Sequence, residues 1–450
     1  MAKPTAIWWV RRDLRLGDNP ALGAAVGAGA VLPVFVLDDE LWGPAGGPRR
    51  AFLRGALEHL DAATGGHLVV RRGEPAEILA GLVEETGART VTAAADFGPY
   101  ARRRDEAATA AVEGAGATLR WVGSPYAVDP GTVRKADGTP FRVFTPFSRA
   151  WVARGWRPPA DRPARVTWSP GVEGDALPDV AGVDAALPVP GEGAALRRLE
   201  AFLQDDADDY AEERDRPGAD RTSRLSPYLH WGCVHPRTLL ARLDPRRKGH
   251  AVWRTELCWR EFYADVLWHE PASARRSLQR RMSRMEVDSG PRAEERFAAW
   301  AEGRTGYPII DAGMRQLRAE AWMHNRVRMI TASFLVKDLH IDWTWGARWF
   351  LRHLVDGDLA SNNHGWQWVT GTGTDPAPYF RVFNPVAQGR RFDPQGAFVR
   401  RWVPEVAGLD DRHVHCPWAL GGVAGYPDPI VDHEAERREA LARYQALPMA

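Results

Sequence analysis

The 450-residue chain is 44% hydrophobic and carries a formal net charge of only +1. This length predicts two or three domains with sizeable cores, and the absence of an apolar run of about 18 residues excludes a transmembrane helix. Three cysteines without CxxC spacing (Cys233, Cys258 and Cys416) argue against a disulfide framework or a zinc site, so we expect a cytoplasmic protein without a signal peptide.

The N-terminal part of the chain predicts a doubly wound parallel sheet in an α/β, Rossmann-like domain. Short apolar runs typical of buried strands alternate with segments of helical spacing. We predict strands over 6–10, 30–38, 67–72, 88–96 and 117–123, and helices over 20–28, 49–62, 75–86 and 100–114. RRDLRLGDN follows the first strand in place of GxGxxG, so any ligand of this domain must be recognised without a dinucleotide fingerprint.

The composition changes after this domain. Residues 140–151 are rich in aromatic residues and predict an extended stretch, and the prolines and glycines of 158–190 predict a long connector. From about residue 193 the apolar spacing is helical and no convincing strand follows. We therefore expect an α/β domain over 1–128, a linker over 129–195 and a larger all-α domain over 196–450, in which the residues after about 410 are peripheral.

Charge and tryptophan content are both uneven. Lys and Arg outnumber Asp and Glu between Arg221 and Arg400, whereas the remainder of the chain is acidic. Such asymmetry suggests a basic face for a polyanion, although a solvated arginine-rich surface explains it equally well. The 20 tryptophans are more than ordinary usage, and most of them are explained by a tryptophan-rich core.

The stretch from Trp343 to Phe392 combines features that a plain core cannot accommodate. An acidic pair (Asp356 and Asp358) and an amide pair (Asn362 and Asn363) follow a helical run of bulky apolar residues. Buried polar groups of this kind require hydrogen-bonding partners. A large aromatic ligand that carries many hydrogen-bonding groups would supply them.

Several long motifs resemble one known family. Residues 356–385, DGDLASNNHGWQWVTGTGTDPAPYFRVFNP, are similar to the flavin-binding signature of photolyases and cryptochromes, most of all class I cyclobutane pyrimidine dimer photolyases. Further similarity lies in WWVRRDLRLGDNPAL (8–22), TSRLSPYLHWG (222–232), WREFY (259–263), GYPIIDAGMRQL (306–317) and WMHNRVRMITASFLVKDL (322–339). The resemblance covers nearly the whole chain and implies an α/β antenna domain and a helical FAD-binding domain.

The resemblance implies FAD-binding residues in two regions. Around the diphosphate these are Tyr210, Thr222, Ser223, Leu225, Ser226 and Arg260; around the flavin ring they are Arg328, Asp356, Asp358 and Asn362. In the family, Arg328 and Asp356 pair beside the ring, and Asn362 faces the reactive flavin nitrogen. An amide can accept or donate a hydrogen bond without being a strong acid, which suits a fully reduced flavin and favours repair over sensing.

The resemblance also implies a tryptophan relay that carries electrons from the surface to the flavin. Trp366 and Trp343 match its first two positions, but the third position is Gly290. Either Trp345 or Trp349 takes the outer role, or photoreduction is slow. Both could equally be core residues.

Substrate residues are implied in the same way. The catalytic set that lines the cavity for a flipped dimer is matched by Glu256, Trp259, Asn325, Met329 and Trp368, together with Asn362. The indoles would form apolar walls, and Glu256 and Asn325 would bond the pyrimidine carbonyl and imino groups. The DNA phosphates are assigned to Arg214, Arg326 and Arg381. No metal is implied.

Three functions follow as alternatives. The first is light-dependent repair of cyclobutane pyrimidine dimers in DNA by a deoxyribodipyrimidine photo-lyase, and the second is a cryptochrome-type blue-light photoreceptor. The third is an α/β nucleotide-binding domain joined to a helical nucleic-acid module without photochemistry. We expect a monomer.

For the antenna, Arg49 and Asp96 lie near the expected site, and Ala101 replaces the glutamate of folate-binding members, which favours a deazaflavin or no antenna.

Overall fold

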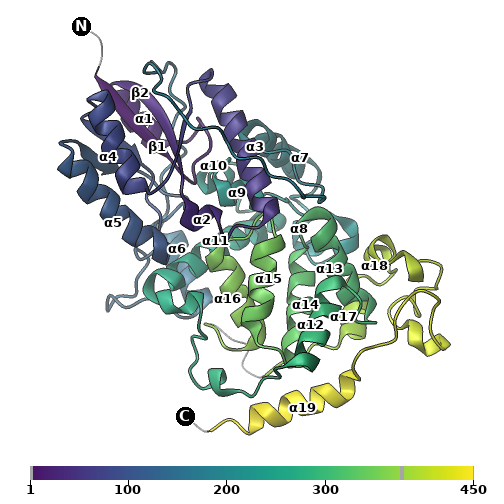
Figure 1. Cartoon of the computed structure of the whole chain (residues 1–450). Helices are drawn as coiled ribbons and strands as arrows, with labels where there is room; N and C mark the ends of the chain where they lie inside the picture. Colours follow the sequence, from purple (N-terminus) through teal and green to yellow (C-terminus); the bar gives the residue numbers. More distant parts are fainter. Residues whose placement is uncertain (1–3, 375–379, 449–450) are drawn as a thin grey trace. The chain divides into compact units, whose positions relative to one another are not determined.

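The computed structural model describes residues 4–374 and 380–448, and the chain forms two compact units (Figure 1). The first unit comprises Met1–Val183, Pro188–Ala207 and Ser223–Pro271. The second comprises Asp184–Leu187, Asp208–Thr222 and Ala272–Ala450. The helical segments within 188–207 and 223–271 thus group with the sheet rather than with the later helices.

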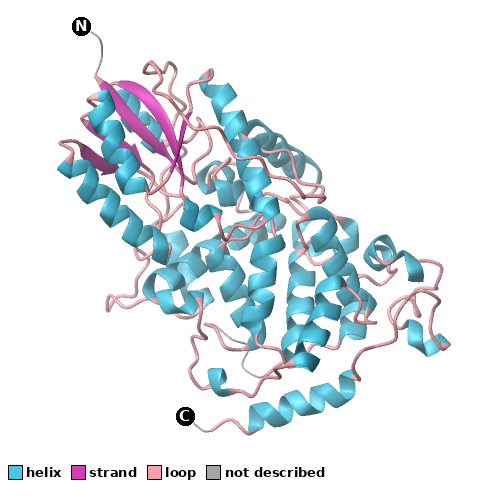
Figure 2. Ribbon diagram, in the orientation of Figure 1, coloured by secondary structure: helices cyan, strands magenta, loops and turns pink. Residues whose placement is uncertain are grey.

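All the strands in the described chain belong to one parallel sheet in the first unit, in the order β3-β2-β1-β4-β5 (Figure 2). The strands are β1 (Thr5–Val10), β2 (Ala30–Leu37), β3 (Val69–Arg72), β4 (Thr90–Ala93) and β5 (Thr118–Trp121). The helices between them are α1 (Pro20–Ala28), α2 (Asp39–Trp42), α3 (Gly47–Thr64), α4 (Pro75–Thr86) and α5 (Pro99–Gly114). The predicted doubly wound parallel sheet is confirmed.

Helices cover both faces of this sheet. Val91 shares one apolar core with Leu79 of α4 and Val112 of α5, so these two helices pack on one face. Thr92 points to the other face, where its Oγ1 donates to the carbonyl of Ala21 in α1 at 2.9 Å. Burial on both faces explains why β1 and β2 are almost continuously apolar rather than alternating.

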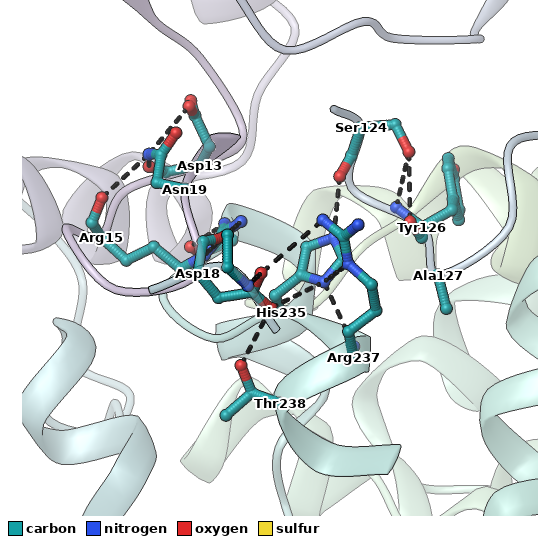
Figure 3. Close-up of polar contacts among 12 residues, drawn as sticks. Asp13, Arg15, Asp18, Asn19, Ser124, Tyr126, Ala127, His235, Arg237 and Thr238 are labelled. Atoms are coloured by element: carbon teal, nitrogen blue, oxygen red, sulfur yellow. Dashed lines mark hydrogen bonds and ion pairs between the residues drawn. The ribbon is translucent and has the colours of Figure 1, made fainter. Parts of the chain in front are cut away.

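The loop after β1 is held by other parts of the first unit (Figure 3). Asp18 lies against His235, with 3.2 Å between Oδ2 and Nδ1, and accepts from Thr238 Oγ1 at 3.1 Å. The Nη1 of Arg15 donates to the carbonyl of Gly232 at 2.9 Å. A Cβ at Gly232 would lie 1.9 Å from the carbonyl oxygen of Arg12, so only glycine permits this approach. RRDLRLGDN therefore connects the sheet to the helical segments of its own unit.

The remaining helices of the first unit are α6 (Phe144–Arg154), α7 (Glu192–Asp205), α9 (Ser226–Trp231), α10 (Pro236–Leu240) and α11 (Lys248–His269). The extended stretch predicted over 140–151 is wrong, because α6 begins within it. Phe144, Phe147 and Trp151 recur at helical spacing and are buried, and the only proline of the helix falls in its first turn, where it is tolerated. The connector over 158–190 has no helix, as predicted.

Helices are the regular secondary structure of the second unit, and none of its described residues belongs to a β-strand. Its helices are α8 (Tyr210–Glu213), α12 (Pro291–Glu302), α13 (Pro308–Glu320), α14 (Asn325–Lys337), α15 (Trp343–His353), α16 (Leu359–Thr370), α17 (Pro385–Phe392), α18 (Ala397–Trp402) and α19 (His433–Gln445). Helices α14, α15 and α16 lie side by side around one core (Figure 1). No described helix of either unit has the length and hydropathy needed to cross a membrane.

The residues after about 410 contribute to this core, contrary to the expectation that they are peripheral. Val414, Tyr426 and Val431 are all buried in it. Tyr426 donates from Oη to Asp311 Oδ2, and Tyr307 donates from Oη to the carbonyl of Val431 at 2.9 Å. The apolar residues of this segment are separated by prolines and show no helical or strand period, so the sequence gives no sign that they are buried.

Candidate functional site

A buried ion pair connects α14 to the turn before α16. Arg328 donates from Nη2 to Asp356 Oδ2 at 2.9 Å and to Oδ1 at 3.2 Å, and from Nε to the carbonyl of Met323 at 2.8 Å. The Asp356 side chain is 3% exposed and that of Arg328 is 26% exposed. Desolvating such a pair is costly, so its presence points to a role beyond stability.

The polar residues that follow have identifiable partners. Asp358 is the N-cap of α16, where its Oδ1 accepts from the Ser361 amide at 2.9 Å. Asn362 donates from Nδ2 to the carbonyl of Ala347 at 3.1 Å and to Asn363 Oδ1 at 2.8 Å. Both bonds use the nitrogen of Asn362, and within residues 4–374 and 380–448 no group donates to its Oδ1, which can accept from a ligand.

The predicted relay residues lie at the contact between α15 and α16. Trp366 is 2% exposed and Trp343 is 5% exposed. Trp343 donates from Nε1 to Ser277 Oγ at 3.1 Å. A Cβ at Gly346 would lie 2.1 Å from Cη2 of Trp366, so the two helices approach closely at this glycine.

Three of the predicted substrate residues lie at the margin of the same core. Asn325 is exposed at the first position of α14, and Met329 follows one turn later on the same face, half-buried. Trp368 in α16 is also partly buried, and both Met329 and Trp368 pack against the core. Met329 and Trp368 are thus held by the core and remain partly exposed, and Asn325 is exposed beside Met329. Side chains in such positions can contact a ligand.

The predicted phosphate-binding arginines of the second unit have neighbours of their own. Arg326 donates from Nη2 to Asp215 Oδ2 at 2.8 Å, and its Cζ lies 4.4 Å from the ring centroid of Phe392. Arg214 lies 5.7 Å from the ring centroid of Tyr210, which is buried at the start of α8. The carbonyl of Arg381 accepts from Lys337. The motif residues 375–379 lie outside the described residues.

The diphosphate-type residues divide between the units. Thr222 belongs to the second unit, whereas Ser223, Leu225, Ser226 and Arg260 belong to the first. The Ser223 carbonyl accepts from Arg198 Nε at 2.9 Å, and Leu225 is buried beside Ser226, the first residue of α9. Between them Arg224 has φ +48°, in the left-handed region that non-glycine residues rarely adopt. Such backbone strain is a feature of functional turns.

Arg260 is engaged within the first unit. It donates from Nη1 to the carbonyl of Pro125 at 3.0 Å and from Nη2 to that of Leu229 at 3.2 Å. Its Cζ also lies 4.6 Å from the ring centroid of Tyr126. These contacts fix the guanidinium beside α9 and leave it fewer donors for a phosphate.

Glu256 and Trp259 lie on α11. Glu256 is half-buried, and the Trp259 ring stacks on Phe144 of α6, with centroids 3.6 Å apart and planes at 5°. Two residues after Trp259, Glu261 accepts from Trp151 Nε1 at 2.6 Å and from the Val128 amide at 3.1 Å. Burial raises the pKa of Glu261 to about 7, even though these donors favour the carboxylate. The α6 contact therefore fixes the orientation of this part of α11.

Two buried titratable residues of the motifs, His364 and Lys337, were not singled out by the sequence interpretation. His364 in α16 donates from Nδ1 to the Ala360 carbonyl at 2.8 Å and accepts at Nε2 from Ser273 Oγ at 2.9 Å. Burial lowers the pKa of His364 to about 4. Lys337 donates from Nζ to the carbonyl of Val369 at 2.7 Å, and burial lowers the pKa of Lys337 to about 7. The position of Lys337 at the end of the apolar run of α14 was the sequence signal that could have indicated its burial.

For the antenna, Asp96 pairs with Arg12, with 3.5 Å between Oδ1 and Nη1. Burial would raise the pKa of Asp96, but the neighbouring arginines hold it below its ordinary value. Ala101 is buried in α5. The ion pair with Arg12 therefore explains the presence of Asp96 without a ligand.

Among the described residues, no group of three or more His, Cys, Asp or Glu side chains could hold a metal ion.

The polar groups of the second unit fit a flavin. A buried carboxylate is paired with a guanidinium that is itself partly exposed, and an amide keeps a free acceptor oxygen one helical turn before Trp366. A heteroaromatic ring that carries both donors and acceptors can use each of these groups. The two units together define a flavoprotein architecture in which an α/β sheet precedes a helical cofactor-binding domain.

Comparisons with known proteins agree with this class. Residues 6–164 match the DNA photolyase family model, and residues 253–446 match that of the FAD binding domain of DNA photolyase. The chain is 43% identical to the deoxyribodipyrimidine photo-lyase of Streptomyces griseus, over 97% of this chain and 98% of that protein. It is 38% identical to the Escherichia coli photo-lyase, over 98% of each.

Solved structures give the same result. A class III photolyase from Agrobacterium tumefaciens superposes with a TM-score of 0.92 and 37% identity, covering 99% of this chain and 98% of that one. A cryptochrome from Synechocystis superposes with a TM-score of 0.89 and 27% identity, over 98% and 99%. The chain belongs to the DNA photolyase family, and the predicted enzyme class and FAD domain are confirmed.

Proposed function

We propose that the protein repairs cyclobutane pyrimidine dimers in DNA under blue or near-ultraviolet light. The observation that carries this proposal is full-length similarity to enzymes named deoxyribodipyrimidine photo-lyase. The buried Arg328–Asp356 pair and Asn362 in the helical unit support it, because they suit a flavin held reduced. Reduced FAD, when bound, absorbs the light and supplies the electron that opens the cyclobutane ring, with no net redox change.

In this proposal, five side chains contact the pyrimidine dimer. Trp259 and Trp368 offer flat apolar surfaces for a dimer that has left the base stack, and extrusion is cheap for a poorly stacked lesion. Glu256 and Asn325 bond the pyrimidine carbonyl and imino groups, and Met329 fills the remaining apolar surface. Glu256 also holds a proton where negative charge develops during ring opening.

Three arginines position the strand. Arg214, Arg326 and Arg381 bind the phosphates near the lesion, which fixes register and carries little sequence information. For Arg326, a phosphate would compete with Asp215, its partner at 2.8 Å. Binding should therefore weaken steeply as salt rises.

For light harvesting, we propose a deazaflavin antenna, or none, in the α/β unit. Ala101 is buried and offers no carboxylate, which argues against the folate of other members. The absorbance spectrum of the purified protein distinguishes the two, because the antenna contributes its own band after the flavin is bleached by reduction. We also propose that the protein acts as a monomer in the cytoplasm.

The test is a repair assay with ultraviolet-irradiated DNA. Purified, reduced protein should restore thymines under blue light and leave them dimerised in darkness. A substrate that carries only the (6–4) photoproduct should stay unrepaired, since the single His324 does not supply a histidine pair. Light-driven flavin reduction without any repair would instead support a photoreceptor like the Synechocystis cryptochrome.

A further inference from the structure

A buried carboxylate, Glu261, holds two distant parts of the first unit against α11. Its Oε1 accepts from the Ala127 amide at 2.5 Å. Its Oε2 accepts from the Val128 amide at 3.1 Å and from Trp151 Nε1 at 2.6 Å. The two amides belong to the segment that follows β5, and Trp151 belongs to α6. Glu261 is 2% exposed, so these three protein donors satisfy its oxygens in place of water.

The bond to Trp151 fixes the position of α6. Trp151 is fully buried and lies two turns after Phe144 on this helix. Phe147, between them, contacts Phe262 of α11 with ring centroids 5.0 Å apart. A shift of α6 along its axis or around it would therefore move all three of its buried aromatic side chains together.

Phe144 in turn supports Trp259, which the proposed function places in the wall of the substrate site. The two rings are stacked, with centroids 3.6 Å apart and planes at 5°. One face of the indole is thereby covered, and the side chain remains partly exposed. The angle of this apolar wall thus depends on the position of α6, and so on the bonds of Glu261.

The ionisation state of Glu261 decides how many of these bonds it can make. A carboxylate only accepts, whereas a protonated carboxyl carries an O–H that needs an acceptor. The group that faces it from α6 is the neutral indole of Trp151. On α11, burial raises the pKa of the Cys258 thiol and keeps it neutral. Arg260, which binds the Pro125 carbonyl at 3.0 Å, favours the carboxylate, but burial outweighs it and raises the pKa of Glu261 to about 7.

We propose that Glu261 is a positioning residue for recognition of the dimer, because it holds α6 where Phe144 supports Trp259. This proposal rests on the proposed function, in which Trp259 contacts the extruded pyrimidines. When Glu261 gains a proton, one of its oxygens becomes a donor that faces N–H groups, and at least one of the three bonds is lost. The wall then loses its fixed angle, and the dimer loses contact area. Selective binding of the lesion therefore weakens as the pH falls through the pKa of Glu261, about 7.

The experiment measures binding in darkness to a duplex that carries one cyclobutane dimer and to the same duplex without it, from about pH 6 to about pH 8.5. The ratio of the two affinities removes changes in the general attraction to phosphates. For the wild type, this ratio should fall severalfold toward the acidic end. Glu261→Gln presents an N–H group where the carboxylate has an oxygen, so its ratio should be low at every pH. A wild-type ratio and pH profile in Glu261→Gln would overturn the proposal.

Asp265→Asn is the matched control. Asp265 lies one turn after Glu261 on α11, is 1% exposed, and accepts from the Gly131 amide at 2.7 Å. Burial raises the pKa of Asp265 as well. It holds the same connecting segment rather than α6, so its variant should keep the wild-type affinity ratio and pH profile. Equal effects in Asp265→Asn and Glu261→Gln would contradict a role for Glu261 through α6.

Turnover separates positioning from a merely structural role. With the flavin reduced chemically, Glu261→Gln should raise KM for the dimer severalfold and change kcat by less than about twofold, because Glu261 contacts neither the lesion nor the flavin in this proposal. Trp151→Phe removes one donor and should lower the affinity ratio, and the double variant should be no worse than Glu261→Gln. If flavin content and melting temperature fall while KM of the folded protein is unchanged, Glu261 is only structural and the proposal is wrong.

Hydrogen exchange followed by NMR tests the bonds of Glu261 without DNA. After correction for the intrinsic effect of pH, exchange of the Ala127 and Val128 amides and of the Trp151 indole N–H should be faster in Glu261→Gln than in the wild type at about pH 8.5. If the wild type shows no preference for dimers while this result holds, the proposed function fails and the hold on α6 stands. If dimers are preferred and exchange is the same in both proteins, the positioning role alone is wrong.

Discussion

Arg328 donates from one nitrogen, Nη2, to both carboxylate oxygens of Asp356, at 2.9 and 3.2 Å. The two residues are far apart in sequence, and the pair connects α14 to the segment that begins α16. Its buried member is the carboxylate, which is 3% exposed. The removal of Arg328 would therefore leave a negative charge in a site that water scarcely reaches.

Arg328→Met should lower the free energy of unfolding by about 3 kcal/mol and release FAD, because breaking one side of a buried pair leaves its partner uncompensated. Denaturant unfolding and flavin absorbance measure the two effects. Arg304→Met is the matched control, since its pair with Glu302 is exposed and should contribute less than about 1 kcal/mol. Equal losses in the two variants would contradict a special role for Arg328.

Glu256→Ala should reduce the yield of dimer repair severalfold while FAD remains bound. Glu256 lies on α11 and its proposed contacts are to the lesion, so the electron supply is unaffected. Repair under blue light by pre-reduced protein, normalised to flavin content, measures the effect. Glu256→Gln keeps the hydrogen bonds and should recover binding more than turnover. Loss of flavin from either variant would show that Glu256 supports the cofactor instead.

The sheet could be predicted from the sequence because its signals are local. Long apolar runs marked β1 and β2, shorter apolar segments marked the other three strands, and prolines after capping residues marked the helix starts. Asn19 accepts from the Leu22 amide at 3.0 Å directly before Pro20, and Glu74 accepts from Glu77 before Pro75. Each such signal lies within a few residues of the feature that it determines.

The site could be predicted only in part. The residues of α14 and α16 follow from a long motif, but their partners do not. Ser277 bonds Trp343 and Ser273 bonds His364, and neither serine belongs to a recognisable pattern. Tyr426, interpreted as peripheral, is buried against Asp311. Such pairings depend on how distant helices pack, which a linear sequence does not display.

His364 gives a prediction about pH. Burial lowers its pKa from 6.5 to about 4, and both ring nitrogens are engaged in a way that suits the neutral form. Because the folded pKa is below the unfolded value, the stabilisation is complete above pH 6.5 and is lost as the pH falls toward 4. Its full size is about 3 kcal/mol.

His364→Gln isolates this contribution, since other buried groups titrate in the same range. The variant should be less stable than wild type at pH 7.5, and the difference between the two should shrink by about 3 kcal/mol as the pH is lowered to 4. Denaturant unfolding at a series of pH values measures it. A difference that stays constant with pH would mean that the imidazole is not neutral in the fold.

A substitution at Gly346 should change the stability of the protein, because this glycine lies where α15 contacts α16. A methyl group there would lie 2.1 Å from Cη2 of Trp366 and 2.6 Å from Cδ2 of Leu335, both within a buried core. Gly346→Ala should therefore destabilise the protein by about 1–3 kcal/mol, because overpacking outweighs the gain of at most about 1 kcal/mol in helix propensity.

Gly81→Ala is the matched control, because this glycine lies inside α4 and a Cβ there would meet nothing within 4 Å. It should raise stability by about 0.5–1 kcal/mol, the ordinary preference of a helix for alanine. Because the methyl group at position 346 also displaces the Trp366 ring, Gly346→Ala should slow photoreduction, whereas Gly81→Ala should leave it unchanged. If Gly346→Ala stabilised the protein as Gly81→Ala does, the close approach of α15 to Trp366 would be excluded.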